Sequence, residues 1–217
     1  MPDPTMSLLQ APRAQRDGMT SAWLSLPPSV GEFMKYGDDP TQYRTRPVSN
    51  LPIAYGQAAT LLLDGMISRA KQSPGAANDF IPPYLLLWRH CIELQLKETL
   101  EMVANHTSQW TTATGQAVNT TFFAKDIRES HSLLRLWQEI HPLVETILQK
   151  PQHDWHLPAL PLATVASLIG QLHQIDPGGD GVRYDRRRDG NPTMLGVNRV
   201  DLEHTQYYLF GIAEFLL

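Results

Sequence analysis

Residues 84–100, YLLLWRHCIELQLKETL, form the stretch that most constrains the fold of this chain. They include no proline or glycine, and at about 100° per residue their apolar side chains fall on two sides of a helix. One side carries Leu85, Ile92, Leu96 and Leu100, and the other carries Leu87, Cys91 and Leu94. A helix that is apolar on two sides must be covered on two sides. This segment therefore belongs at the centre of a helical bundle.

A polar strip separates the two apolar sides of this helix. It contains Arg89, His90, Glu93 and Lys97. Arg89 and Glu93 are four residues apart, so their side chains can form an ion pair. Such a pair at the edge of a core loses hydration energy, which makes its net contribution to stability small. Two interpretations stay open: the pair fixes the orientation of the helix, or the strip faces a cleft.

Other segments repeat the helical spacing of apolar residues. We expect helices over 51–72, from 82 to about 105, from about 130, within 158–176, and from about 200 to 217. Pro142 should kink or split the third of these helices. A polar loop with a short hairpin, turning at Asp189–Gly190 or Gly190–Asn191, is expected before the last helix. The predicted fold class is therefore an all-α bundle of about five helices.

Residues 1–47 differ from the rest of the chain, because they hold 7 of its 17 prolines. Proline removes a backbone donor and blocks helix interiors, so we expect an irregular arm beside a single bundle domain at 48–217. Apolar residues in WLSLPPSVGEFM, residues 23–34, indicate that the arm lies along a surface of its own body or of a partner. Residues 106–129 are long for a plain connection and are expected to be mobile or functional.

Composition excludes several classes of protein. A formal net charge of -4 gives no general attraction to nucleic-acid phosphate, although local basic patches remain possible. Cys91 is the single cysteine, so neither an internal disulfide nor a cysteine-based zinc site can form. No apolar run approaches the roughly 18–20 residues that span a bilayer, and the N-terminal residues do not resemble a secretory signal. We expect a cytoplasmic protein without membrane contact.

Metal and cofactor motifs are weak. The segment from Asp176 resembles a calcium loop, but Gly178 and Arg187 occupy positions that need oxygen ligands. His153 and His156 lack a third convergent ligand for a metal. Alternating acids favour a solvated loop for the basic run at 183–188, although it could bind phosphate. We expect no metal and no cofactor.

Four segments occur in an order that resembles a known family. They are LLLWRHCIELQLKETL (85–100), SHSLLRLWQEIHPLV (130–144), IDPGGDGVRYDRRRDGNP (175–192) and VDLEHTQYYLFGIAEFL (200–216). Together they resemble the bacterial branch of the HEPN superfamily, over about residues 82–217. The resemblance implies a compact helical bundle, usually a homodimer. Many members of the family act in defence or toxin–antitoxin systems, which makes an antitoxin-like protein a candidate partner.

The same resemblance implies two types of activity. Some members of the family are metal-independent RNases with an Arg-x(4–6)-His motif assembled across the dimer, and others have lost the motif and bind ligands or partners. In this chain the spacing is met by Arg199 with His204 and by Arg135 with His141. We prefer the first pair, because Arg135 lies opposite the apolar side of its helix.

The candidate catalytic pair would cleave RNA without a metal. A histidine such as His204 can take the proton of a ribose 2′-hydroxyl, and an arginine such as Arg199 can hold the phosphate. However, Val200 stands where the family usually has a polar residue, which argues against catalysis.

A polar cluster is the second candidate site. We expect Arg89, Glu93, His131, Arg183 and Tyr184 to converge on one pocket, because each is polar where a resembling segment meets the bundle. The cluster is either a buried network that fixes a loop to the helices or a ligand site. We therefore favour a non-catalytic helical module that binds a nucleotide, RNA or a protein partner. The alternative is a metal-independent RNase that uses the Arg199–His204 pair.

Overall fold

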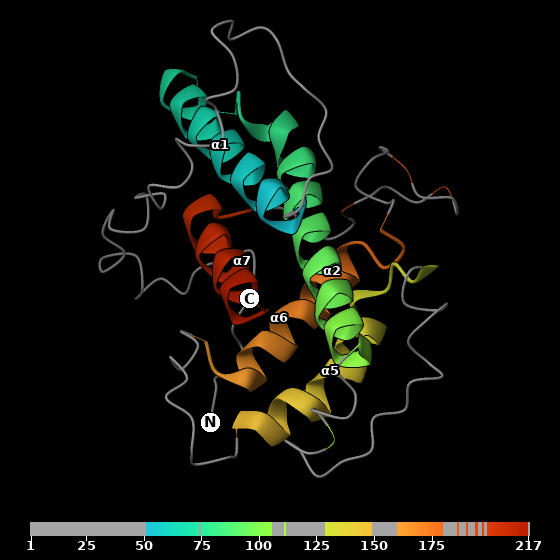
Figure 1. The fold of residues 1–217 in the computed structure, drawn as a ribbon. Coiled ribbons are helices and arrows are strands. Elements are labelled where there is room, and N and C mark those ends of the chain that lie inside the picture. The colour runs from blue at the N-terminus through green and yellow to red at the C-terminus, as the bar shows by residue number, and fades with distance from the viewer. Residues whose placement is uncertain are drawn as a thin grey trace, which may run out of the picture.

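The computed structural model describes residues 51–73, 75–105, 111, 129–148, 160–179, 186, 190, 194, 197 and 199–216. Its helices are α1 (Leu51–Gln72), the short 3₁₀ helix η4 (Asn78–Phe80), α2 (Ile81–Asn105), α5 (Leu133–Leu148), α6 (Leu162–Ile175) and α7 (Leu202–Leu216). These helices pack together into an all-α bundle (Figure 1). The predicted fold class is therefore confirmed.

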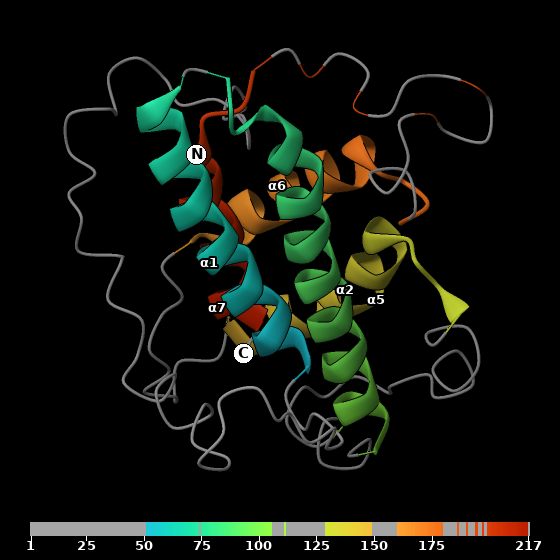
Figure 2. The ribbon, with the colours of Figure 1, turned by 90° about the horizontal axis from the view of Figure 1, so that it is seen from above.

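Helix α2 lies at the centre of the bundle. It packs against α1, α5 and α7, and α6 closes the bundle against α5 and α7. Figure 2 shows α1 running along one flank of α2, with α5 beside the other flank. Pro82 and Pro83 stand in the first turn of α2, where their missing N–H groups cost no helical hydrogen bond.

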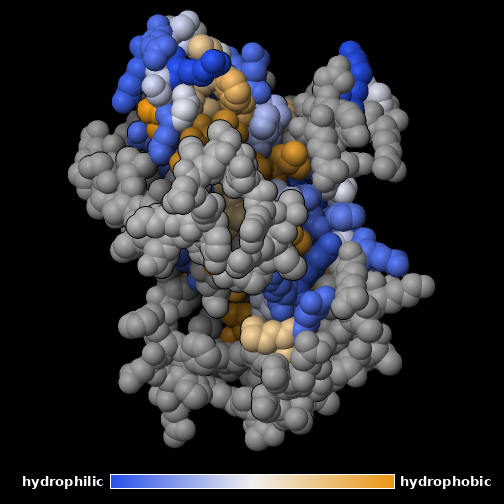
Figure 3. Space-filling model, turned by 45° about the horizontal axis from the view of Figure 1, so that its top comes forward, coloured by the Kyte–Doolittle hydropathy of each residue, from blue (hydrophilic) through white to orange (hydrophobic). Residues whose placement is uncertain are grey.

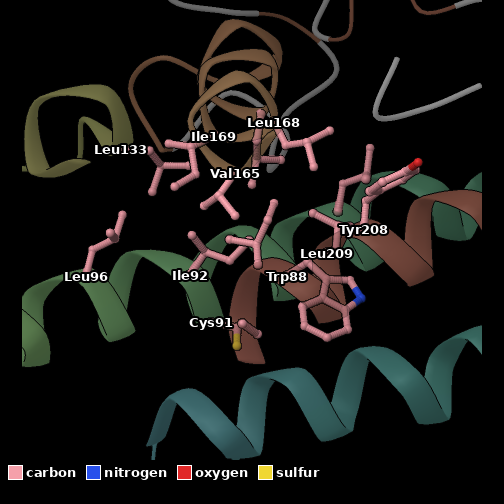
Figure 4. Close-up of a cluster of buried hydrophobic side chains, with 14 of the residues drawn as sticks. Trp88, Cys91, Ile92, Leu96, Leu133, Val165, Leu168, Ile169, Tyr208 and Leu209 are labelled. Carbon is pink, nitrogen blue, oxygen red and sulfur yellow. The ribbon is translucent and has the colours of Figure 1, made fainter. Parts of the chain in front are cut away.

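The core forms on the two sides of α2. Leu85, Ile92, Leu96 and Leu100 are each at most 1% exposed. Figure 4 shows Ile92 pointing toward Val165 of α6, while Cys91 points toward α1. A Cβ atom on Gly56 of α1 would lie 3.4 Å from the Cys91 sulfur, which reflects the close approach of the two helices. On the second apolar side Cys91 is buried, but Leu87 and Leu94 are only partly buried.

Helix α5 departs from the expectation in two ways. It begins at Leu133 rather than near 130, because the Ser132 side chain accepts a hydrogen bond from the Arg135 N–H and caps the helix. Pro142 does not split it, because α5 continues to Leu148. The buried side chains of Ile140 and Leu143 flank the proline and hold both turns against the core.

Several expectations fall on other parts of the chain. The proline-rich arm at 1–47, nearly all of 106–129, and most of the expected hairpin lie outside the described residues. Within the described helices, none is long and apolar enough to cross a membrane.

Candidate functional site

The carboxylate of Glu93 on α2 contacts three nitrogen groups. Glu93 is 3% exposed, and its Oε2 lies 2.7 Å from Nη1 of Arg89. Its Oε1 lies 2.8 Å from Nζ of Lys97 and 2.9 Å from Nδ1 of His131. The helical spacing of four residues places Arg89 and Lys97 one turn before and one turn after the carboxylate. His131 comes from the segment that leads into α5, so Glu93 joins two elements.

Arg89 connects α2 to two further segments. Its side chain is 1% exposed, and its Nε donates to the carbonyl oxygen of Asp176 at 3.1 Å. The Oδ2 atom of Asp176 lies 3.4 Å from the same nitrogen. Nη2 donates to the carbonyl oxygen of His131. One guanidinium group thus holds the segment before α5 and the residue after α6 against α2.

The Asp-Pro-Gly-Gly turn after α6 covers this guanidinium group. The Gly179 N–H donates to Oδ1 of Asp176 at 3.0 Å, and Gly179 has a φ of +80°. A Cβ atom at this position would lie 2.9 Å from Nη1 of Arg89. A side chain is therefore excluded here both by the backbone conformation and by the arginine.

The charge state of the cluster follows from its contacts. Burial alone would raise the pKa of Glu93, but hydrogen bonds and charges from Lys97 and Arg89 outweigh burial and lower the pKa to about 2. Glu93 is thus ionised at neutral pH and can only accept hydrogen bonds. The His131 nitrogen that faces it, Nδ1, must therefore carry a proton.

A second histidine lies near the cluster. His173 of α6 has a lowered pKa, because it is partly buried and close to the positive charge of Arg89, although Asp176 opposes the shift. We infer that this imidazole is neutral at pH 7.

Comparisons with protein families, with characterised proteins and with solved structures give no match. The resemblance to the HEPN superfamily therefore stays a prediction, and the geometry of the described residues carries the functional argument.

The structure brings together three members of the predicted polar cluster, namely Arg89, Glu93 and His131. Arg183 and Tyr184 lie outside the described residues. The predicted cluster omitted Asp176, Lys97 and Gly179. A sequence clue existed for each: Lys97 follows Glu93 by one helical turn, and the Asp-Pro-Gly-Gly sequence predicts a tight turn after α6.

The candidate catalytic pair sits at the start of α7. Arg199 is exposed, whereas His204 is 2% exposed. The His204 ring packs edge-on against Tyr208 with ring centroids 4.7 Å apart. The backbone N–H of His204 donates to the Asp201 side chain at 3.2 Å. The arginine therefore faces solvent while the imidazole lies in the core of the chain.

The other pair with this spacing lies on α5. Arg135 is exposed, as expected from its position opposite the apolar side of the helix. His141 is half-buried, and its ring lies 5.5 Å from that of Trp137.

The chemistry open to the polar cluster is limited by its charge balance. Arg89 and Lys97 are matched by the carboxylates of Glu93 and Asp176. Each nitrogen of the buried guanidinium group already contacts protein oxygen. His131 differs from the others, because its side chain is 58% exposed. It is the member of the described cluster best placed to meet a ligand.

Proposed function

We propose that this protein is a non-catalytic helical module that binds RNA or a nucleotide, with His131 as a contact residue. The ligand class comes from the resemblance to the HEPN superfamily. The observation that carries the non-catalytic part is the different exposure of the preferred pair, because Arg199 is exposed and His204 is buried. Arg89 offers no substitute for Arg199, because its charged group is buried and used by Glu93, Asp176 and His131. A guanidinium group in this state is not available to hold a phosphate in a transition state.

Burial of His204 supports the same choice. A general base must come within hydrogen-bond reach of the proton that it removes, and the His204 side chain is shielded within the chain. Arg199 alone, on the surface, provides a positive charge but no proton acceptor.

The proposed contact depends on how Glu93 holds the His131 ring. Nδ1–H of the imidazole donates to the buried carboxylate at 2.9 Å, so the ring has a fixed direction. Nε2 is the ring nitrogen that does not face Glu93, and the side chain as a whole is 58% exposed. In the neutral ring this nitrogen accepts a hydrogen bond, for example from a ribose hydroxyl, and in the protonated ring it donates one to a phosphate.

A binding assay with a matched variant tests the proposal. The probes are a fluorescein-labelled single-stranded RNA of mixed sequence and labelled ATP, both in the presence of EDTA. His131→Asn keeps an amide donor for Glu93 but removes Nε2. We expect it to lower affinity about tenfold, as the loss of one charge-assisted hydrogen bond does, with an unchanged melting temperature. Gln174→Ala, an exposed change on α6, should alter neither quantity.

The same samples separate the RNase alternative. The labelled RNA should remain intact after prolonged incubation. Cleavage in EDTA that disappears in both Arg199→Ala and His204→Ala, with the fold retained, would replace the binding module with a metal-independent RNase. An absence of binding to both probes would remove the ligand class, and capture of a protein partner would then become the leading function. Light scattering on the same protein tests the homodimer that the resemblance implies.

A further inference from the structure

The outward side of α1 has an unusual composition for an exposed helix. The residues from Leu51 to Leu63 include no charged side chain. Leu61 is 60% exposed and Leu51 is 40% exposed. Surface helices of water-soluble bundles normally carry charged residues on the side away from the core. Helix α1 instead has uncharged, largely apolar residues on both sides over more than half its length. This composition is typical of a helix whose outward side is covered by another segment.

The exposed apolar residues form a regular stripe. At spacings of three and four residues, it contains the exposed residues Leu51, Ala58, Leu61 and Gly65, together with the half-buried Ala54. The stripe lies on the side of α1 away from Ala59, Leu63 and Met66, which are at most 2% exposed. A Cβ atom on Gly65 would meet no atom within 4 Å, so there is open space beside this end of the stripe. Figure 3 shows orange, hydrophobic surface beside blue residues in the upper part of the view.

The size of the stripe argues against a second copy of the chain as its cover. From Leu51 to Gly65 the helix rises about 21 Å and is about 10 Å wide, so the stripe offers roughly 200 Å². A stable protein–protein interface buries about 800 Å² on each partner. A segment of the same chain does not need this area, because a tether supplies an effective concentration in the millimolar range.

We propose that residues 23–34 of this chain bind to the outward stripe of α1. This segment carries Trp23, Leu24, Leu26, Phe33 and Met34 within twelve residues. It precedes α1 directly in the chain, with 16 residues between Met34 and Leu51. Sixteen residues can span up to about 55 Å, whereas Leu61 lies only about 15 Å along the helix from Leu51. Pro27 and Pro28 suit an extended segment that packs through side chains rather than backbone hydrogen bonds.

Thiol labelling of the full chain tests this contact. Leu61→Cys places a reactive group in the stripe, and a polyethylene-glycol maleimide reports its accessibility. The native Cys91 does not interfere, because burial raises the pKa of its thiol to about 12. We expect the introduced thiol to react about tenfold faster when Trp23→Ala, Leu26→Ala and Phe33→Ala are added, since each removes apolar surface that the proposed contact would bury.

A control thiol and a dilution series complete the experiment. Gln174→Cys, on the exposed side of α6, should react at the same rate with and without the three alanine substitutions. Equal rates at the α1 thiol with and without the three alanine substitutions would overturn the proposal. Protection that increases with protein concentration and survives those substitutions would assign the stripe to a second copy, and would overturn it equally.

Discussion

At the scale of single residues, Arg89 has the most demanding environment among the described side chains. Its charge is almost fully removed from water, and the desolvation of a buried charge costs several kcal/mol. Contacts with Glu93, the carbonyl oxygens of Asp176 and His131, and the Asp176 carboxylate offset this cost. The net gain in stability is small, but removal of one partner leaves a charge buried and unpaired.

Glu93→Gln should therefore lower the free energy of unfolding by about 3–5 kcal/mol, the usual cost of breaking a buried ion pair. Urea unfolding followed by circular dichroism measures the change. Glu98→Gln is the matched control, because it makes the same chemical change on the exposed side of the same helix, and it should cost less than about 1 kcal/mol. Similar small losses in both variants would contradict the account of the cluster.

The acid sensitivity of the protein is a second residue-scale prediction. The pKa of Glu93 is lowered from 4.5 to about 2 in the folded protein. A carboxylate with a lowered pKa stabilises the fold at pH values above its unfolded pKa, and the contribution is lost as the pH falls toward the folded pKa. The difference in unfolding free energy between wild type and Glu93→Gln should thus be constant above about pH 5 and shrink between pH 4.5 and 2.

A pH series of urea unfolding curves on both proteins measures this difference. If the gap between them stayed constant down to pH 2.5, the carboxylate of Glu93 would not be the titrating group.

At the scale of elements, hydrophobic spacing predicts the helices well, because each one buries an apolar side. Helix α2 was expected from 82 to about 105 and runs from Ile81 to Asn105. Local features such as prolines and capping residues are less reliable predictors of where a helix ends or is interrupted. Pro142 lies inside α5, since packing of the residues around it outweighs the loss of one backbone hydrogen bond.

The candidate site could be predicted only in part. The contact between Arg89 and Glu93 follows from helical spacing alone. His131 was placed correctly beside Glu93, because it lies just before α5, the helix that packs on α2. The role of Asp176 could not be derived, since it depends on the direction that the chain takes after α6. The Asp-Pro-Gly-Gly sequence predicts a turn there, but no periodic pattern gives the direction in which this turn leads the chain.

The turn after α6 gives a prediction at this scale. Gly179→Ala should destabilise the protein by about 3–5 kcal/mol, because it combines a strained backbone with displacement of the buried Arg89 group. Gly190 is a matched control, since it has a φ of +82° but a Cβ atom added to it would meet no atom within 4 Å. Gly190→Ala should cost only about 1–2 kcal/mol, from the backbone alone. Thermal unfolding of both variants measures the difference, and equal losses would contradict the packing role.

At the scale of the whole molecule, one side chain on the last helix joins the first two long helices of the described bundle. Oε1 of Gln206 on α7 accepts hydrogen bonds from the Tyr84 hydroxyl at 2.9 Å and from Nε1 of Trp88 at 3.0 Å. Nε2 of the same amide donates to the Thr60 hydroxyl of α1 at 3.0 Å. Gln206 is separated by more than 100 residues from each of its three partners on α1 and α2, so these contacts form only when α7 has packed against both helices.

Gln206→Met preserves the length of the side chain but removes both hydrogen-bonding groups. It should lower the free energy of unfolding by about 2–4 kcal/mol, because two buried donors, on Tyr84 and Trp88, lose their shared acceptor. Tyr84→Phe removes one of these donors, so the double variant should be more stable than the sum of the single losses predicts, by about 1 kcal/mol. A urea-unfolding double-mutant cycle measures this coupling. Strict additivity would mean that Gln206 acts by packing alone, and that α1, α2 and α7 are held together by their apolar contacts without the amide.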